Sequence, residues 1–306
     1  MHRTIAPLII ATATLAAIGS ERHRAAAAAP VAQGIDWKAV EQAMGRAGAM
    51  QPDDVYKFAL PRSDLAVTIA AIRLKPALAL GSWVAFKATG SGAVAMGDLV
   101  LLEAEVAPVM AALAEGGIAV TAIHHHLLHE SPRVYYMHIH GSGDAVTLAR
   151  AIRAAIALTP TPPPPAAAAA PAATPMGFDT ARIVQALGVA GKLNGTVFQV
   201  SVPRPDTIRE NDVVIPPAMG TATALNFQPT GGANAATTGD FVLRGAEVTP
   251  VLQALRRHGI EVTAVHNHML DEEPRLFFVH FWGVGDAVQL ATGLRAALDV
   301  MSGAAR

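Results

Sequence analysis

Cysteine is absent from this chain of 306 residues. Disulfide bonds, thiolate metal ligands and cysteine nucleophiles are therefore excluded. An excess of charge of either sign is also lacking, because the formal net charge is −1 at pH 7. Proteins that bind nucleic acids through a broad basic surface need clustered lysine and arginine. We therefore expect no nucleic-acid partner.

The chain also lacks the short motifs that identify several common enzyme classes. It has no H-E-x-x-H zinc motif, no G-x-x-x-x-G-K phosphate loop and no G-x-S-x-G nucleophile elbow. These absences argue against metalloproteases of that type, P-loop nucleotide hydrolases and serine hydrolases.

An apolar run long enough to concern a membrane occurs only near the N-terminus. A basic start is followed by apolar residues from Thr4 to Gly19 and then by small residues from Ala26 to Gln33. This order is typical of a secretory signal peptide. We expect residues 1–32 to be removed by cleavage within 26–33, no stable membrane span afterwards, and a periplasmic or secreted product. The charged stretch Glu21–Arg24 leaves an uncleaved N-terminal anchor as the alternative.

The remainder of the chain is an internal repeat. Residues Gly97–Ala155 align without gaps with Gly239–Ala297, and about half of the aligned positions are identical, which indicates a duplicated domain. A stretch rich in proline and alanine separates the copies and predicts an extended spacer. We predict a first domain at 36–158, a linker at 159–176 and a second domain at 177–302, with contact between the two domains.

Each copy has the pattern of an α+β domain. Runs such as VYKFAL, WVAFKA and LVLLEAE predict strands, whereas the glycine-rich segments GSGAVAMGD and GGANAATTGD are interpreted as loops. Helices are expected at 37–48, 106–115, 145–158 and 180–191. These elements predict a mostly antiparallel sheet with helices on one face. The strand-helix-strand-strand-helix order is ferredoxin-like by analogy.

Histidines are concentrated in one segment of each copy. The segment TAIHHHLLHESPRVYYMHIHGSGD holds six of the twelve histidines, and TAVHNHMLDEEPRLFFVHFWGVGD is its counterpart. Side chains alternate between the faces of a strand. Alternation predicts that the matched histidines share a face opposite the helices: His124, His126 and His138 in the first copy, and His266, His268 and His280 in the second. The apolar residues expected under the helices are Ile123, Leu127, Tyr135, Met137 and Ile139, and Val265, Met269, Phe277, Val279 and Phe281.

Three imidazoles on one sheet face can form a metal site. Neutral imidazole binds zinc and other divalent transition metals, and an open fourth position would hold water or substrate. We therefore predict a metal or small-ligand site formed by these histidines in each copy. If the protein is an enzyme, metal-activated water is the expected chemistry, as in a metal-assisted hydrolase. Further residues near the histidines could assist: Asp98, Asp240, Glu130, Glu272, Arg133 and Arg275.

The same residues allow other interpretations. The histidines could be structural, bonded to carboxylates in a non-catalytic envelope interaction protein. Because imidazole titrates near neutral pH, they could also form a pH-responsive surface. Arg133 and Arg275 could pair with the local carboxylates Glu130 and Glu272 instead of binding a ligand. Whether the two copies share one site or hold two is left open by the sequence.

The segment from GDFVLRGAEVTPVLQALRRHGIEVTAVHNHMLDEEPRLFFVHFW to GLRAAL resembles the LppY/LpqO family of bacterial exported proteins. The resemblance covers residues 37–299. It implies an exported or envelope-associated protein with a doubled domain, and it implies no particular activity. Acylation at a lipobox needs a cysteine, so this chain is expected to be periplasmic or secreted instead of lipid-anchored.

Overall fold

The computed structural model describes residues 34–164 and 176–301. The predicted signal peptide, most of the predicted linker and the final residue of the predicted second domain lie outside the described residues. Within these ranges, both repeats form a six-stranded antiparallel sheet accompanied by helices, so the predicted α+β class is confirmed. Among the described helices, none is both long and apolar enough to cross a membrane.

The sheet of the first repeat has the strand order β1-β2-β5-β6-β9-β7. Its strands are β1 (Ala49–Gln51), β2 (Val55–Pro61), β5 (Gly81–Thr89), β6 (Gly92–Leu102), β9 (Val134–Gly143) and β7 (Ala119–His124). Its longer helices are α1 (Trp37–Met44), α3 (Glu103–Glu115) and α4 (Ala145–Ile156), and its short elements are η1 (Pro52–Asp54), α2 (Pro76–Ala79), β3 (Thr68–Ile69), β4 (Ile72–Arg73) and β8 (Glu130–Ser131). Strand β9 lies between β6 and β7, so β6-α3-β7 is a split β-α-β unit.

The second repeat has the same arrangement, with the strand order β10-β11-β14-β15-β18-β16. Its strands are β10 (Gly191–Asn194), β11 (Val197–Pro203), β14 (Ala222–Gly231), β15 (Asn234–Arg244), β18 (Leu276–Asp286) and β16 (Glu261–His266). Its longer helices are α5 (Thr180–Leu187), α6 (Gly245–Arg257) and α7 (Ala287–Met301), and its short elements are β12 (Arg209–Glu210), β13 (Val213–Val214), η2 (Pro217–Met219) and β17 (Glu272–Glu273).

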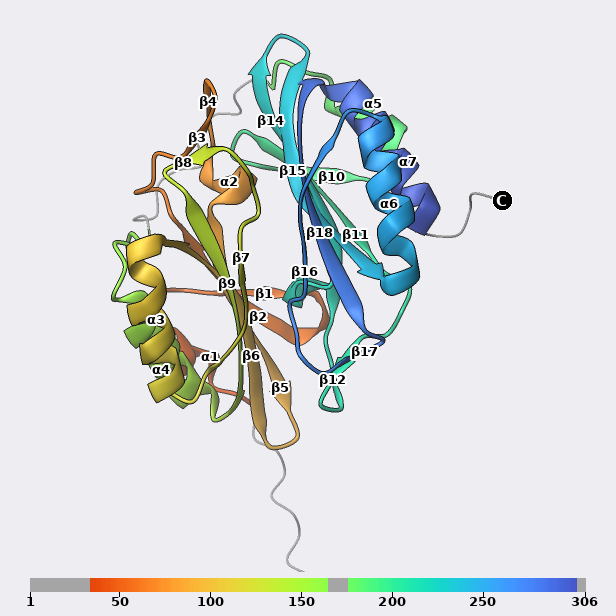
Figure 1. Cartoon of the computed structure of the whole chain (residues 1–306). Helices are drawn as coiled ribbons and strands as arrows, with labels where there is room; N and C mark the ends of the chain where they lie inside the picture. The colour runs from red at the N-terminus through yellow and green to blue at the C-terminus, as the bar shows by residue number, and fades with distance from the viewer. Residues whose placement is uncertain (1–33, 165–175, 302–306) are drawn as a thin grey trace, which may run out of the picture. The chain divides into compact units, whose positions relative to one another are not determined.

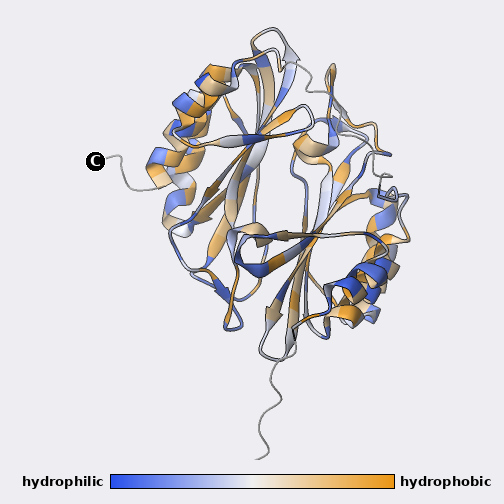
Figure 2. Ribbon diagram, turned by 180° about the vertical axis from the view of Figure 1, so that it is seen from behind, coloured by the Kyte–Doolittle hydropathy of each residue, from blue (hydrophilic) through white to orange (hydrophobic). Residues whose placement is uncertain are grey.

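In each repeat, one face of the sheet packs against the longer helices. Figure 1 shows α3 and α4 along one side of the first sheet, and α6 and α7 along one side of the second. Met137 and Ile139 on β9, and Val279 and Phe281 on β18, are buried in these two cores as predicted. The helices carry both hydrophobic and hydrophilic positions (Figure 2), which is the pattern of a helix with one packed face.

The second faces of the two sheets pack against each other. One apolar cluster combines Val100 and Tyr136 of the first repeat with Val197 and Trp282 of the second. Another combines Val55 and Met96 of the first repeat with Ile208 and Phe278 of the second. The predicted contact between repeats is therefore present, and it covers the faces that carry the matched histidines.

Several local predictions are wrong. Helices α1 and α5 end at Gly45 and Gly188, three residues before the expected ends, because these glycines adopt the left-handed conformation that stops a helix. The segments interpreted as glycine-rich loops belong largely to β6 and β15. Their small side chains suit strands that are flanked closely on both sides.

Four of the apolar residues expected under the helices do not lie there. Ile123 and Val265 are 36% and 48% exposed, because β7 and β16 are edge strands with a neighbour on one side only. Leu127 and Met269 are buried, but in the clusters between the repeats. The chain leaves the strand after His124 and His266, so alternation no longer determines where the side chains of Leu127 and Met269 point.

Strands β14 and β15 approach each other closely at Gly239. A Cβ atom at this position would lie 1.8 Å from the backbone oxygen of Ala224 and 2.7 Å from its carbonyl carbon. We expect Gly239→Ala to lower the free energy of unfolding by about 1–3 kcal/mol, because backbone must move to relieve the overlap. Denaturant unfolding measures this loss. Gly90→Ala is the control, since its Cβ would meet nothing within 4 Å, and equal stability of the two variants would contradict the account.

Candidate functional site

Two cross-strand pairs form the centre of the histidine-bearing faces. On the first sheet, His138 of β9 pairs with Asp98 of β6. On the second sheet, His280 of β18 pairs with Asp240 of β15. Directly paired residues of antiparallel strands project from the same face. Each sheet thus places one imidazole beside one carboxylate, and all four residues are buried or nearly so.

His124 and His266 are the last residues of β7 and β16, where they pair with Tyr136 and Phe278. Their rings lie 5.0 Å from His138 and 4.7 Å from His280, measured between ring centroids. Strand alternation therefore predicted correctly that each of these histidines shares a face with its neighbour on the next strand.

His126 and His268 lie beside the other matched histidines for a different reason from the one predicted. They follow the ends of β7 and β16, so strand alternation does not orient them. Instead, the ring of His126 stacks on Tyr136 with a centroid distance of 3.3 Å, and the ring of His268 stacks on Phe278 at 3.4 Å. These aromatic supports were missed by the sequence reasoning. The available signal was an aromatic residue two positions before His138 and before His280.

The histidines of the two repeats meet in three close pairs. His124 lies 3.6 Å from His266, His126 lies 3.7 Å from His280, and His138 lies 3.8 Å from His268, between ring centroids. The six matched histidines therefore form one group, which we call the histidine cluster.

Hydrogen bonds from two threonine side chains to backbone carbonyl groups hold the two halves of the cluster together. The Oγ1 hydroxyl of Thr121 donates to the carbonyl oxygen of His268 at 2.5 Å, and the Oγ1 hydroxyl of Thr263 donates to the carbonyl oxygen of His126 at 2.5 Å. The contacts are reciprocal because Thr121 and Thr263 occupy equivalent positions in the two copies. Each repeat thus fixes the loop that carries a histidine of the other repeat.

The ring nitrogens of the cluster are largely without partners. Nδ1 of His280 donates to the carbonyl oxygen of Gly239 at 2.7 Å, and His138 bonds to the backbone of Gly97. Nε2 of both rings remains buried with no hydrogen-bond partner, as do Nε2 of His126 and both ring nitrogens of His124 and His266. Nε2 of His268 also makes no hydrogen bond, but it lies 3.2 Å from Oδ2 of Asp240. A ring held through Nδ1–H presents the lone pair of Nε2, which is the usual state of a metal-ligating histidine.

Burial determines the charge state of the cluster. Removal from water lowers the pKa of all six imidazoles, and neighbouring histidines lower several of them further. Burial lowers the pKa of His268 to about 3 and raises the pKa of Asp240 to about 6. The pKa of Asp98 is raised well above its ordinary value by burial and by the charge of Asp240. The imidazoles are therefore neutral at pH 7, the form that binds metals.

These pKa shifts predict that the metal-free protein is destabilised by acid. In the unfolded chain the histidines titrate near pH 6.5, whereas in the fold they resist protonation, so the unfolded state binds more protons as the pH falls. The raised pKa values of two aspartates act in the opposite direction, but six imidazoles outweigh them. Stability should therefore be greatest near pH 8 and fall towards pH 6, by about 0.8 kcal/mol for each imidazole before the aspartates offset part of the loss.

Urea unfolding of metal-free protein at pH 8, 7 and 6 measures this dependence. The variant His129→Ala should show the same dependence as the original chain, since the side chain of His129 is 75% exposed and lies outside the cluster. A free energy of unfolding that is constant or increases from pH 8 to pH 6 would contradict the description of the cluster.

Within the described residues, four groups of side chains could each hold a metal ion, with all their ligand atoms within 4.8 Å of one another. Ligand atoms on one zinc ion lie within roughly 4 Å of one another, so closure of a group around an ion requires only small shifts. The groups are Asp240, His266, His268 and His280; Asp98, His126 and His138; His124, His126 and His280; and His124, His138 and His266.

The other predicted helpers lie outside these groups. Glu130 of β8 and Glu272 of β17 belong to separate three-stranded sheets, where they pair with Ile69 and Glu210. Oε1 of Glu272 accepts a hydrogen bond from the backbone N–H of Leu276. Oε1 of Glu130 lies 3.8 Å from Nδ1 of His125, and among the described residues neither glutamate belongs to a potential ligand group. A helper role for them stays a prediction.

The arginines of the same turns are also separate from the cluster. Arg275 is a partner of Glu272, with Nη1 and Oε2 3.3 Å apart, and its side chain is 49% exposed. This is the local pairing that the sequence allowed as an alternative. Arg133 is exposed and belongs to none of the potential ligand groups in the described residues.

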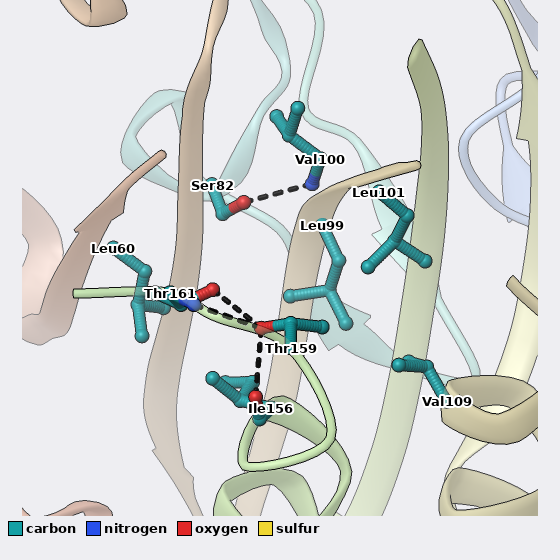
Figure 3. A pocket seen from close by; sticks show the side chains of 9 residues that line it. All are labelled: Leu60, Ser82, Leu99, Val100, Leu101, Val109, Ile156, Thr159 and Thr161. Atoms are coloured by element: carbon teal, nitrogen blue, oxygen red, sulfur yellow. Dashed lines mark hydrogen bonds between the residues drawn. The ribbon is translucent and has the colours of Figure 1, made fainter. Parts of the chain in front are cut away.

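A small cavity elsewhere is unconnected with this chemistry. It has a volume of about 10 Å³, close to the space of a single water molecule. Figure 3 shows its lining of aliphatic and hydroxyl side chains, including Leu60, Val109 and Ile156, with Ser82 accepting a hydrogen bond from the backbone N–H of Val100. No titratable side chain lines it.

Comparison with known proteins identifies the repeat. A family model matches residues 38–158 and again residues 181–300, and its description is Domain of Unknown Function (DUF1259). The predicted tandem duplication is thereby confirmed. A search of curated proteins finds no match.

Two solved structures are similar only weakly. One is a trimeric bacterial microcompartment shell protein, PduB, with 13% identity, coverage of 85% of this chain and 93% of that chain, and a TM-score of 0.21. The other is EtuB from Clostridium kluyveri, with 10% identity, coverage of 84% and 92%, and a TM-score of 0.20. TM-scores this low establish no common fold.

Proposed function

We propose that this chain, which belongs to the Domain of Unknown Function (DUF1259) family through both of its repeats, binds a transition metal. The site is the histidine cluster, where the two copies meet. The ligands come from His124, His126, His138, His266, His268 and His280, and zinc or another divalent transition metal is the ion. Asp98 and Asp240 supply negative charge beside the imidazoles.

One observation carries this proposal: every histidine of the cluster keeps at least one buried ring nitrogen without a hydrogen-bond partner. Each unsatisfied buried polar atom costs about 1–3 kcal/mol, so a purely structural cluster would be expensive. A metal ion accepts the lone pairs of several such nitrogens at once and removes this cost. Carboxylates approach two of these nitrogens: Nε2 of His268 lies 3.2 Å from Oδ2 of Asp240, and Nε2 of His126 lies 3.8 Å from Oδ2 of Asp98. The ring nitrogens of His124 and His266 have no partner of this kind.

Elemental analysis tests the proposal directly. The full chain is produced without a histidine tag, purified without chelating resin, and its metal content and thermal unfolding are measured with and without added Zn²⁺, Cu²⁺ or Ni²⁺. We expect at least about one ion per chain and a higher unfolding temperature, since a ligand that binds only the folded state must stabilise it. Mg²⁺ is the control, because it prefers oxygen ligands. Less than about 0.1 ion per chain with no thermal shift would contradict the proposal.

We also propose that the protein works outside the cytoplasm. The support is the basic, apolar and small-residue pattern of residues 1–32 and the resemblance to the exported LppY/LpqO proteins. N-terminal sequencing of protein recovered from a periplasmic or culture fraction is expected to find a new N-terminus within residues 26–33. Recovery of the chain only from the cytoplasm with an intact N-terminus would contradict this proposal.

A further inference from the structure

The four potential ligand groups are not equivalent, because only two of them contain a carboxylate. These two are Asp240 with His266, His268 and His280, and Asp98 with His126 and His138. They share no residue, and each draws its ligands from one repeat. The two groups that combine histidines of both repeats consist of neutral imidazoles only.

Charge favours the two groups with carboxylates. A divalent cation taken out of water needs compensating negative charge nearby, and neutral imidazoles supply none. Asp98 and Asp240 are the carboxylates that belong to the described ligand groups, and they lie in separate groups. An ion in each group would therefore have one carboxylate of its own.

The two groups differ in their number of ligands. The Asp240 group offers four ligand atoms, which completes the tetrahedral coordination usual for zinc. The Asp98 group offers three, because His124 is not within reach of all its members. The Asp98 group thus leaves a coordination position for water or an anion.

A lysine near Asp98 increases the expected difference in metal affinity between the two groups. Lys57 of β2 donates from Nζ to the carbonyl oxygen of Ala218 and lies 3.9 Å above the ring of Trp83, which is the cross-strand partner of Asp98. Its positive charge acts on Asp98. The equivalent residue of the second repeat is Gln199, which donates to the carbonyl oxygen of Ala77 and carries no charge. A cation beside Asp98 is therefore repelled, whereas one beside Asp240 is not.

We propose that the histidine cluster holds two divalent transition-metal ions, one with each carboxylate, and that the Asp240 position fills first. This inference rests on the proposed metal-binding function and deepens it. The Asp240 position is closed by protein ligands. The Asp98 position is weaker and keeps an open place for water or an anionic ligand, so exogenous molecules bind there.

Native mass spectrometry of the full metal-free chain titrated with Zn²⁺ tests this inference. We expect two ions per chain at saturation, with dissociation constants that differ by about tenfold or more, since one unit charge acts nearby. Asp240→Asn should remove the tight step, and Asp98→Asn should remove the weak step. Lys57→Gln introduces the residue of the second repeat. It should lower the dissociation constant of the weak step and reduce the ratio between the two dissociation constants. Arg133→Gln is the control and should change neither step.

The outcomes separate this inference from the proposed function. One ion per original chain at saturation would overturn the two-ion inference while metal binding by the cluster remains. No ion bound would overturn both. Two ions of equal affinity, unaffected by Lys57→Gln, would overturn the order of filling. The stoichiometry of the original chain needs no variant, so it decides the count even if a substitution impairs folding.

Discussion

Replacing His138 and His280 together by alanine is expected to remove most of the stabilisation that transition-metal binding provides. Each of the four potential ligand groups contains one of these two histidines, so three groups fall to two ligands and the Asp240 group falls from four ligands to three. At a free metal concentration of about a thousand times Kd, the original chain should gain about 4 kcal/mol of stability from the ion. The double variant should gain about 2 kcal/mol or less, because only the incomplete Asp240 group remains.

The stabilisation is measured within each variant, as the difference in free energy of unfolding with and without Zn²⁺. Loss of packing in the metal-free form then cancels from the comparison. The matched control is His129→Ala with His258→Ala, which also removes two histidines, both exposed and outside the ligand groups. A double variant His138→Ala, His280→Ala that keeps the full metal-dependent gain would show that the ion binds elsewhere.

The second large effect concerns a buried arginine. The side chain of Arg62 is fully buried, and it donates to Asp64, to both carboxylate oxygens of Glu105 and to the carbonyl oxygen of Val100. We expect Arg62→Met to lower the free energy of unfolding by about 3–5 kcal/mol, because the substitution leaves the buried Glu105 carboxylate without its charged partner. Denaturant unfolding in the absence of metal measures the loss.

Arg150→Met on the exposed side of α4 is the control, with an expected change within about 0.5 kcal/mol. A loss below about 1 kcal/mol for Arg62→Met would show that this ion network does not stabilise the sheet. The same pattern recurs around Arg204, which contacts Asp206, Glu247 and the carbonyl oxygen of Val242. Its recurrence in both repeats explains the matched Pro-Arg-x-Asp sequences at the ends of β2 and β11.

Much of this architecture could be predicted because the repeat supplies a second copy for comparison. The matched positions of His138 and His280 stand out from His140, which becomes Trp282 in the second copy. Strand periodicity then places each of these histidines correctly on the face opposite the helices. The apolar residues Met137 and Phe281 follow the same rule and lie in the helix-covered cores.

The remaining features depend on contacts that no pattern within one repeat contains. His126 and His268 lie beyond their strands and are oriented by stacking on Tyr136 and Phe278. Leu127 turns into the interface between the repeats, because it too follows the strand end. The meeting of the two histidine sets depends on how one sheet docks on the other, which periodicity does not determine.

The most direct test of the account is a crystal structure of the zinc-loaded full chain with anomalous diffraction data collected at the zinc absorption edge. We expect anomalous density within the histidine cluster, with zinc–nitrogen distances of about 2.0–2.1 Å to rings of both repeats. Density at the protein surface alone, or none in a zinc-soaked crystal whose six imidazoles keep their positions, would contradict the proposal.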